Sequence, residues 1–259
     1  MQVKILGCSG GIGGDELQTT SILINENTII DAGTGLVSLT LEQLTRINSI
    51  FITHAHMDHI ASCPMLIDST AELRTEPLVL YALSDTIDSI RKHIFNWEIW
   101  PDFSEINVKE FKSLKFCKVE VGDEFEIPGA GKIIVGPAKH QIQGCSYLLI
   151  GKHDKLFFSG DTSYDKSIIE FINHHKTINH IIIECAFSKK DQELAKLSNH
   201  LDAQSVTQMI KEFDCKSKIY ITHLKPSQRD LIMDEILEDE ELMKNYHVSR
   251  LFAYQVFTL

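Results

Sequence analysis

The sequence contains no closely spaced pair of cysteines. Its six cysteines are scattered over 259 residues, and no CxxC pattern joins any two of them. Structural zinc sites built on thiolates and small disulfide frameworks both need cysteines at short, regular spacings, so neither is expected here. Reduced, buried thiols in a cytosolic protein are the expected state.

Long hydrophobic segments are also missing. No stretch of the sequence reaches the roughly 18 consecutive apolar residues that a membrane-spanning helix needs. The chain begins MQVKILGCSGG, a short strand pattern that runs into glycines without the basic residues and apolar core of an export signal. We therefore expect no membrane span, no export and a cytoplasmic location.

Positive charge is scarce. The chain has 25 Lys and Arg against 36 Asp and Glu, which gives a formal net charge of −11. Nucleic-acid phosphates attract clusters of Lys and Arg, so this charge balance disfavours a general affinity for nucleic acid. The sequence leaves open whether the chain forms a homodimer.

The length and the 43% hydrophobic content suit one large core, and no linker, repeat or low-complexity tract divides the chain, so residues 1–259 are expected to form one domain. Short apolar runs alternate with stretches of helical spacing, which predicts an α/β layered fold with two sheets. The acidic run 235–242 is expected to be the solvated face of the last helix. Helices are expected over 36–47, 64–73, 84–95, 165–175, 202–213 and 228–242, and strands over 3–6, 21–24, 28–33, 49–54, 77–83, 115–121, 132–136, 145–150, 155–161, 180–185, 218–223 and 251–257.

The segment THAHMDHI, residues 53–60, places three histidines and an aspartate at the end of an apolar run. His54 and His56 are two positions apart, so at the end of a strand they would point to the same side. Asp58 and His59 follow at a turn onto a helix and could face a second point beside the first. Because zinc binds histidine nitrogen and aspartate oxygen, the pattern predicts a site for two metal ions.

Other polar residues also stand directly after apolar strands. His140 follows KIIVGPAK, Asp161 follows KLFFSG, and His223 follows KIYIT. Side chains at the C-terminal ends of such strands can converge on one edge of a sheet. A carboxylate shared by two ions, such as that of Asp161, would hold them about 3.5 to 4 Å apart, which suits stabilisation of both the attacking and the leaving oxygen.

These motifs resemble those of the metallo-β-lactamase superfamily over nearly the whole chain. HAHMDH is similar to the HxHxDH signature, and FFSGDT and IYITHLKP are similar to the later aspartate and histidine motifs. The resemblance implies a four-layer αββα sandwich with the site at one edge between the sheets. It also implies two metal-binding sets that share Asp161 as a bridge: His54, His56 and His140 for the first ion, and Asp58, His59 and His223 for the second.

Within that superfamily, the chain resembles class II cyclic-nucleotide phosphodiesterases. HAHMDHIASCPMLIDST is similar to their signature, with Met57 in place of the usual leucine and Cys63–Pro64 where small apolar residues are typical. IFNWEIWPDFS, IIIECAFSKKDQELAKLSNHLDA and THLKP also resemble segments of that family. Where its members usually read GHLTP, this chain reads NHLDA, residues 199–203, and keeps the histidine.

That histidine, His200, belongs to neither metal set. Asp202 is expected to cap the following helix, and a histidine beside such a cap could be an ordinary surface residue. Related phosphodiester hydrolases pair a glutamate and a histidine in this order, which implies that Glu184 orients His200 for phosphate contact and proton donation. We predict Asp58, His200 and Glu184 as the catalytic residues.

Two further segments allow more than one interpretation. IFNWEIWPDF has aromatic residues at Phe95, Trp97, Trp100 and Phe103, which suits either a core or a flat wall for a purine. The loop GCSGGIGG resembles a phosphate-binding loop only weakly, because the GxGxxG spacing is absent. That loop is expected to pack tightly near the metal edge.

The sequence and the resemblance together predict a phosphodiesterase that hydrolyses 3′,5′-cyclic AMP, or cyclic GMP, to the nucleoside 5′-monophosphate. A hydroxide activated by two divalent metal ions would attack phosphorus, and the 3′ oxygen would leave. Zn²⁺ is the expected metal, with Mn²⁺ and Fe²⁺ as alternatives. Two other functions remain open: a tRNA 3′-processing endonuclease, which should carry a basic RNA-binding arm that we do not find in this acidic sequence, and a non-catalytic metal-binding scaffold.

Overall fold

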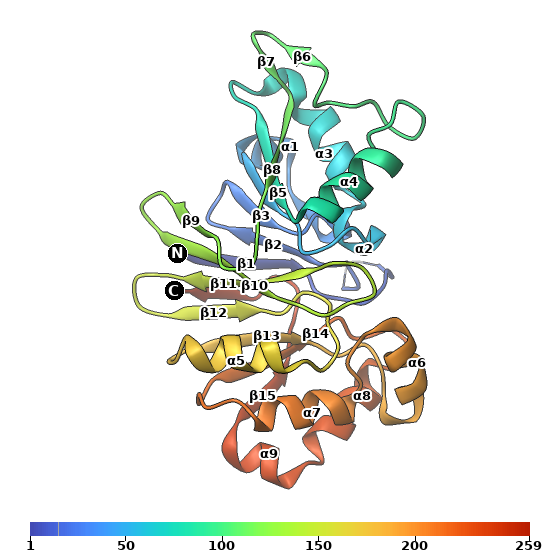
Figure 1. Cartoon of the computed structure of the whole chain (residues 1–259), viewed down its shortest axis with the longest axis vertical. Helices are drawn as coiled ribbons and strands as arrows, with labels where there is room; N and C mark the ends of the chain where they lie inside the picture. Colours follow the sequence, from blue (N-terminus) through green and yellow to red (C-terminus); the bar gives the residue numbers. More distant parts are fainter. Residues whose placement is uncertain (15) are drawn as a thin grey trace.

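Two seven-stranded sheets lie face to face in the computed structural model, which describes residues 1–14 and 16–259 (Figure 1). The first sheet has the order β16-β1-β2-β3-β4-β5-β8 and the second has the order β15-β14-β13-β12-β11-β10-β9. The strands of the first sheet are β16 (Val256–Thr258), β1 (Gln2–Gly7), β2 (Ser21–Ile24), β3 (Thr28–Ile30), β4 (Ser49–Phe51), β5 (Leu78–Ala82) and β8 (Leu114–Lys118). The strands of the second sheet are β15 (His247–Arg250), β14 (Lys218–Thr222), β13 (His180–Glu184), β12 (Lys155–Phe158), β11 (Cys145–Ile150), β10 (Gly131–Pro137) and β9 (Glu124–Ile127), and a separate hairpin joins β6 (Asn107–Val108) and β7 (Phe111–Lys112).

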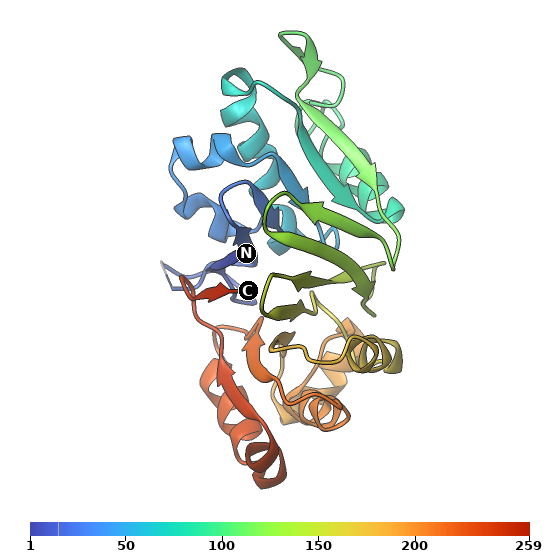
Figure 2. The ribbon, with the colours of Figure 1, turned by 90° about the vertical axis from the view of Figure 1, so that its left-hand side faces the viewer.

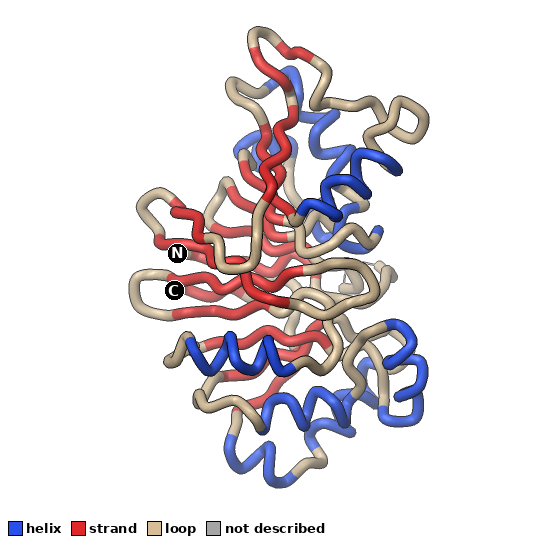
Figure 3. Tube along the Cα trace, viewed as in Figure 1, coloured by secondary structure: helices blue, strands red, loops and turns tan. Residues whose placement is uncertain are grey.

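Helices cover the outer faces of both sheets, and the strands lie inside (Figure 3). Those on the side of the first sheet include α1 (Leu41–Arg46), α3 (Cys63–Thr70) and α4 (Ser84–His93), and those on the side of the second include α5 (Lys166–His174), α7 (Ala203–Lys211), α8 (Arg229–Leu237) and α9 (Glu240–Asn245). The remaining helices are α2 (Met57–Ile60), α6 (Gln192–Ser198) and the 3₁₀ turns η1 (Thr34–Ser38), η2 (Ala71–Leu73) and η3 (Lys189–Asp191). The predicted αββα sandwich is therefore confirmed.

The core has three apolar layers, one between the sheets and one under each group of helices. Successive residues of a strand point to opposite faces, so each strand feeds two layers. In β4, Phe51 packs between the sheets with Tyr147 of β11, whereas Ile50 faces the helices of the first sheet. In β11, Leu148 faces the helices of the second sheet. Burial on both faces explains why these strands are nearly continuous apolar runs in the sequence.

Strand direction brings the polar residues of the sequence to one edge. In the first sheet, β3, β4, β5 and β8 run parallel, and in the second, β12, β13, β14 and β15 run parallel. β10 is antiparallel to β11, which is antiparallel to β12, so β10 runs in the same direction as β12. The loops after β4, β10, β12, β13 and β14 therefore leave their sheets at corresponding ends.

The strands expected over 28–33, 49–54 and 155–161 each end three residues earlier, and three other predicted elements differ more in extent. The helix expected over 36–47 is divided, because Leu39 is extended and Thr40 begins a new helix through reciprocal hydrogen bonds with Gln43. The helix expected over 228–242 is also divided, because Asp239 caps α9, so the acidic run 235–242 spans a junction and is not one helix face. The strand expected over 251–257 forms only at β16, since the chain first crosses from β15 of one sheet to the other (Figure 2).

Some short elements were not predicted at all. These are β6, β7, β9, β15, η3 and α6, and all have seven residues or fewer, whereas the single turn of α2 lies where a turn onto a helix was expected. No helix among the residues that the structure describes is long and apolar enough to cross a membrane.

The predicted cap of α7 leads to the first test. The Asp202 carboxylate accepts hydrogen bonds from the backbone N–H groups of Gln204 (2.9 Å) and Ser205 (3.2 Å), and the side chain is buried. Replacing Asp202 with alanine should therefore lower the free energy of unfolding by about 1 kcal/mol, measured by urea denaturation. The control is Asp88→Ala on the exposed face of α4. Equal losses in the two variants would contradict a capping role for Asp202.

Candidate metal centre

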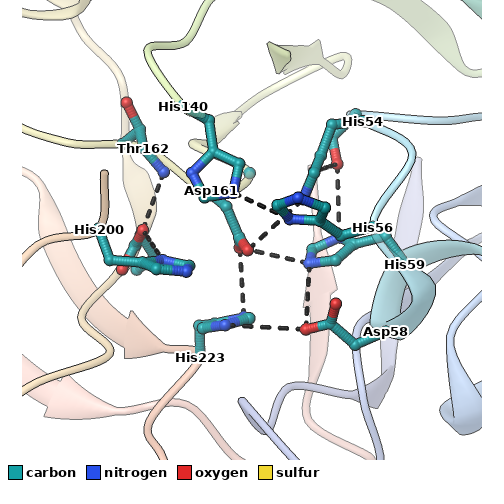
Figure 4. Close-up of polar contacts among 12 residues, drawn as sticks. His54, His56, Asp58, His59, His140, Asp161, Thr162, His200 and His223 are labelled. Atoms are coloured by element: carbon teal, nitrogen blue, oxygen red, sulfur yellow. Dashed lines mark hydrogen bonds and ion pairs between the residues drawn. The ribbon is translucent and has the colours of Figure 1, made fainter. Parts of the chain in front are cut away.

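All seven residues predicted as metal ligands lie together at the edge between the sheets (Figure 4). They come from four loops: the loop after β4, which continues into α2, and the loops after β10, β12 and β14. Within each set, the ligand atoms lie within 4.8 Å of one another. The two sets are His54, His56, His140 and Asp161, and Asp58, His59, Asp161 and His223.

In the first set, ring nitrogens and one carboxylate oxygen face a common point. His54 Nε2 lies 3.6 Å from Asp161 Oδ2. His56 Nδ1 lies 3.0 Å from His140 Nε2. Two imidazole nitrogens that face each other this closely need either a proton or a cation between them.

In the second set, the ring nitrogens of two histidines lie around the other carboxylate oxygen of Asp161. Asp161 Oδ1 lies 3.3 Å from His59 Nε2 and 3.2 Å from His223 Nδ1. Asp58 Oδ2 lies 3.7 Å from His59 Nε2 and 3.8 Å from His223 Nε2. Asp161 thus presents one oxygen to each set, which is the arrangement that a bridging carboxylate requires.

The hydrogen bonding of these histidines fits a bound cation. His54 Nε2, His59 Nε2 and both ring nitrogens of His223 are buried and have no hydrogen-bond partner among residues 1–14 and 16–259. Buried polar groups in native proteins are nearly always paired, so a group of nitrogens beside a carboxylate with no protein partner fits a role as metal ligands. Histidine nitrogen and aspartate oxygen are donors that Zn²⁺ and other first-row metals accept.

Hydrogen bonds on the far side of the rings fix which nitrogen faces the site. His140 Nδ1 donates to the Asn199 carbonyl oxygen at 2.9 Å, which leaves Nε2 free to bind a metal. His59 Nδ1 donates to Asp31 Oδ2 at 2.7 Å. His54 Nδ1 donates to Thr53 Oγ1 at 3.0 Å, and that hydroxyl donates to Asp31 in turn.

Asp31 is a candidate positioning residue that the sequence prediction missed. It is fully buried directly after β3 and orients His59 and, through Thr53, His54. The available signal was its position, because it follows an apolar strand just as the predicted ligands do. Nothing in its neighbourhood along the chain distinguishes it from a turn aspartate.

Burial and charge act on the protonation of the site in opposite directions. Burial lowers the pKa of His54 well below its usual value, lowers that of His56, and lowers that of His140 to about 4. These rings are therefore neutral and able to bind a metal at neutral pH. Burial also disfavours a charged His59, but the carboxylates of Asp161 and Asp31 outweigh it and raise the pKa of His59 well above the usual value. A bound cation would replace the proton on His59 Nε2, the nitrogen that faces Asp161, while Nδ1 keeps its hydrogen bond to Asp31.

The predicted Glu184 and His200 pair is also formed. His200 Nδ1 donates to Glu184 Oε1 at 2.7 Å, and the same oxygen accepts the backbone N–H of Thr162 at 2.8 Å. The His200 ring centroid lies 5.1 Å from that of His223 and 4.7 Å from that of His140. Burial disfavours a charged His200, but Glu184 outweighs it and raises the pKa of His200. His200 is thus held beside both metal sets with its Nε2 opposite the glutamate.

The structure supports one interpretation of the glycine-rich loop GCSGGIGG and leaves the aromatic segment IFNWEIWPDF with both of its interpretations. In the glycine-rich loop, the Cys8 carbonyl accepts the His223 N–H at 2.9 Å, and a side chain on Gly10 would collide with the His223 carbonyl, so this loop packs tightly against a predicted ligand. In the aromatic segment, Phe95 and Phe103 are buried in the core under the helices and Trp100 packs against it, whereas Trp97 is exposed. A role for Trp97 and Trp100 in a nucleotide pocket remains a prediction.

Comparison with known proteins gives matches to cyclic-nucleotide phosphodiesterases and to ribonuclease Z. The family model of class-II cAMP phosphodiesterases matches residues 33–127. A probable 3′,5′-cyclic-nucleotide phosphodiesterase of Yersinia pestis is 25% identical and aligns with 93% of this chain and 84% of its own. A ribonuclease Z of Treponema denticola is also 25% identical, over 92% of each chain.

Two solved structures show the same fold. Unliganded yeast PDE1 has a TM-score of 0.80 at 18% identity and covers 100% of this chain and 99% of its own. The metallo-β-lactamase fold protein YhfI of Bacillus subtilis has a TM-score of 0.75 at 16% identity and covers 99% of this chain and 98% of its own.

The solved structures show that the chain has the fold of the metallo-β-lactamase class of proteins. Within this class, the chain resembles the class II 3′,5′-cyclic-nucleotide phosphodiesterases. The clusters could bind metal ions, and the fold and the family match support a hydrolase.

The residues that depart from the usual GHLTP pattern suit the conformation that the chain has here. Asn199 ends α6 in the left-handed region, with φ 50° and ψ 49°, where glycine and asparagine are the favoured residues. Asp202 stands in the place of threonine, and both residue types are good N-caps. NHLDA therefore ends one helix, presents His200 and begins the next helix.

The role assigned to Asp31 can be tested through metal affinity. Asp31→Asn keeps the size of the side chain but removes the carboxylate that orients His59. We expect the affinity for Zn²⁺ to fall by about 10- to 100-fold, the usual effect of losing such a partner, as measured by competition with a chromogenic chelator.

The matched control is Asp154→Asn. Asp154 Oδ2 lies 3.6 Å from His180 Nε2, an Asp–His pair outside both metal sets. Its substitution should leave Zn²⁺ affinity unchanged. If Asp31→Asn binds Zn²⁺ as tightly as Asp154→Asn does, Asp31 does not position a ligand.

Proposed function

We propose that the chain is a dinuclear metal-dependent phosphodiesterase that hydrolyses 3′,5′-cyclic AMP, or cyclic GMP, to the nucleoside 5′-monophosphate. The observation that carries the proposal is the Glu184 and His200 pair, which stands beside two ligand sets that share Asp161. The class II phosphodiesterase match over residues 33–127 supports the substrate.

In this proposal the seven clustered residues hold two divalent ions, Zn²⁺ or alternatively Mn²⁺ or Fe²⁺. Such ions, when bound, supply a nucleophile at neutral pH and neutralise charge on phosphoryl oxygens. Asp58 is the most exposed of the three carboxylates at the centre, with 31% of its side chain accessible, against 3% for Asp161 and none for Glu184. We assign to Asp58 the further role of accepting a proton from the attacking water.

His200 is proposed as the proton donor to the leaving oxygen. The ribose 3′ oxygen leaves poorly as an alkoxide, so protonation in the transition state lowers the barrier. Glu184 holds Nδ1 of His200, which leaves Nε2 as the nitrogen that can donate. The raised pKa of His200 keeps more of the ring protonated at neutral pH.

A second candidate function is cleavage of an RNA phosphodiester, because the ribonuclease Z of Treponema denticola matches over nearly the full chain. The net charge of −11 favours the small substrate, since RNA binding depends on clustered positive charge.

Product analysis decides between the two. The chain loaded with Zn²⁺ should contain two ions by elemental analysis and convert 3′,5′-cyclic AMP to 5′-AMP, with little turnover of 2′,3′-cyclic AMP or a tRNA precursor. Asp161→Ala removes an oxygen from both sets and should abolish turnover. Cleavage of the tRNA precursor alone would replace the proposed substrate, and one ion or fewer per chain would contradict the dinuclear site.

The donor role of His200 predicts a dependence on the leaving group. His200→Ala should lose about 10²- to 10⁴-fold in kcat on cyclic AMP. It should keep both ions and much of its activity on bis(p-nitrophenyl) phosphate, whose nitrophenolate leaves without a proton. Equal losses on both substrates would mean that His200 binds the phosphate instead.

Glu184→Gln provides the matched test of positioning through the pH profile. A proton donor works below its pKa, so kcat on cyclic AMP should fall as pH rises through the raised pKa of His200. Without the Glu184 carboxylate that pKa drops, and the alkaline limb of the profile should move to lower pH. An unmoved limb with both ions retained would contradict the assigned pair.

A further inference from the structure

A cavity of about 510 Å³ lies next to the metal edge, outside both ligand sets. Its lining comes from the loop that follows β1, the residue after His223, the start of α8 and the segment that leads from β15 to β16. Its volume falls within the range of about 300 to 1,000 Å³ that is usual for small-molecule sites. Its lining includes Ser9, Leu17, Arg229, Arg250, Phe252 and Tyr254.

The two arginines of the cavity point to one place. Arg229 Nε and Arg250 Nη1 each lie 3.5 Å from the same atom, Oδ1 of Asp230. The arginine side chains are only 30% and 22% exposed, whereas the Asp230 side chain is 78% exposed. Their convergence on one carboxylate oxygen marks a position where an anion is favoured.

The ion pairs of Asp230 with the two arginines are weak. Both contacts are long, at 3.5 Å, and ion pairs with an exposed partner contribute little to stability. Glu16 Oε2 lies 4.0 Å from Arg229 Nη1, but its side chain is 86% exposed. Both acidic side chains can therefore turn into solvent and leave the guanidinium groups to another anion.

The rest of the wall is flat and apolar. The Arg250 guanidinium lies 5.1 Å from the centre of the Phe252 ring, and Lys4 Nζ lies 5.7 Å from the centre of the Tyr254 ring. Phe252 and Tyr254 are about half exposed, so both rings have surface available for contact. Aromatic rings with adjacent cations suit a ligand that combines a flat apolar body with a negative charge.

We propose that this cavity binds a small amphiphilic anion, namely a carboxylate or phosphate group attached to a flat apolar body. The anionic group contacts the guanidinium groups of Arg229 and Arg250, which line the cavity and which the Asp230 carboxylate otherwise pairs with from outside the lining. The apolar body lies against Phe252 and Tyr254. The proposal does not depend on the phosphodiesterase activity.

Calorimetric titration of the metal-loaded full chain tests the site with three probes. 1-Naphthoate carries a carboxylate, phenylphosphonate carries a phosphate-like group that cannot be hydrolysed from oxygen, and 1-naphthamide is neutral. At least one charged probe should bind about tenfold more tightly than the amide, as expected for charge-assisted hydrogen bonds. The charged probe that binds more tightly identifies the anionic group that the cavity prefers. Equal binding of the amide overturns the proposal.

Two variants test where the probe binds, because they should change its affinity in opposite directions. Arg250→Gln should weaken binding of the preferred probe about tenfold, and Asp230→Asn should strengthen it by removing the competing carboxylate. The control is Arg91→Gln, which alters an arginine of α4 that lies over Phe116, outside the cavity. It should change nothing.

The proposal is overturned if Arg250→Gln, with an unchanged thermal melt, binds the probe as the parent does. It is also overturned if chelation of the metals abolishes binding while Arg250→Gln does not, since the probe then sits at the metal centre. If Arg250→Gln fails to fold, the exposed Asp230→Asn variant decides the matter, because unchanged or weaker binding there contradicts the proposed position of the anion.

Discussion

The buried carboxylate of Asp161 is the constraint on which the rest of the metal edge depends. It is 4% exposed and presents one oxygen to His54 and the other to His59 and His223. A buried negative charge is costly unless positive charge compensates it. Most of the surrounding imidazoles are kept neutral by burial, so the compensation must come from His59 or from a bound cation. The loops at this edge therefore bring together groups that place a positive charge, from a protonated histidine or a bound cation, beside the Asp161 carboxylate.

Much of this arrangement could be predicted because it follows from position along strands. A strand buried on both faces reads as an apolar run, and the first polar residues after it fall at the sheet edge. His54, Asp161 and His223 all obey that rule. Glu184 and His200 required a family resemblance in addition, since sixteen positions separate them along the chain. The layered fold followed from the same alternation of apolar runs and helical spacings.

The parts that could not be predicted depend on tertiary contacts or on very short elements. Asp31 resembles a turn residue in the sequence, and its function comes from His59, which lies 28 positions away. The breaks at Thr40 and Asp239 are set by capping hydrogen bonds, which here prevail over a continuous apolar spacing. β9 and β15 have four residues each and form because a longer neighbouring strand offers an edge. In each case the structure is determined by a specific contact that the local sequence pattern does not show.

The carbonyl group of Asn199 orients His140, and the next residue in the chain is His200. One peptide unit thus serves a candidate metal ligand on one side and a candidate proton donor on the other. The two are mechanically coupled, so a shift of this unit disturbs both at once. A left-handed residue that is asparagine or glycine maintains the coupling, whereas a β-branched residue at position 199 would strain it. A substitution at position 199 is therefore expected to displace the candidate metal ligand and the candidate proton donor together.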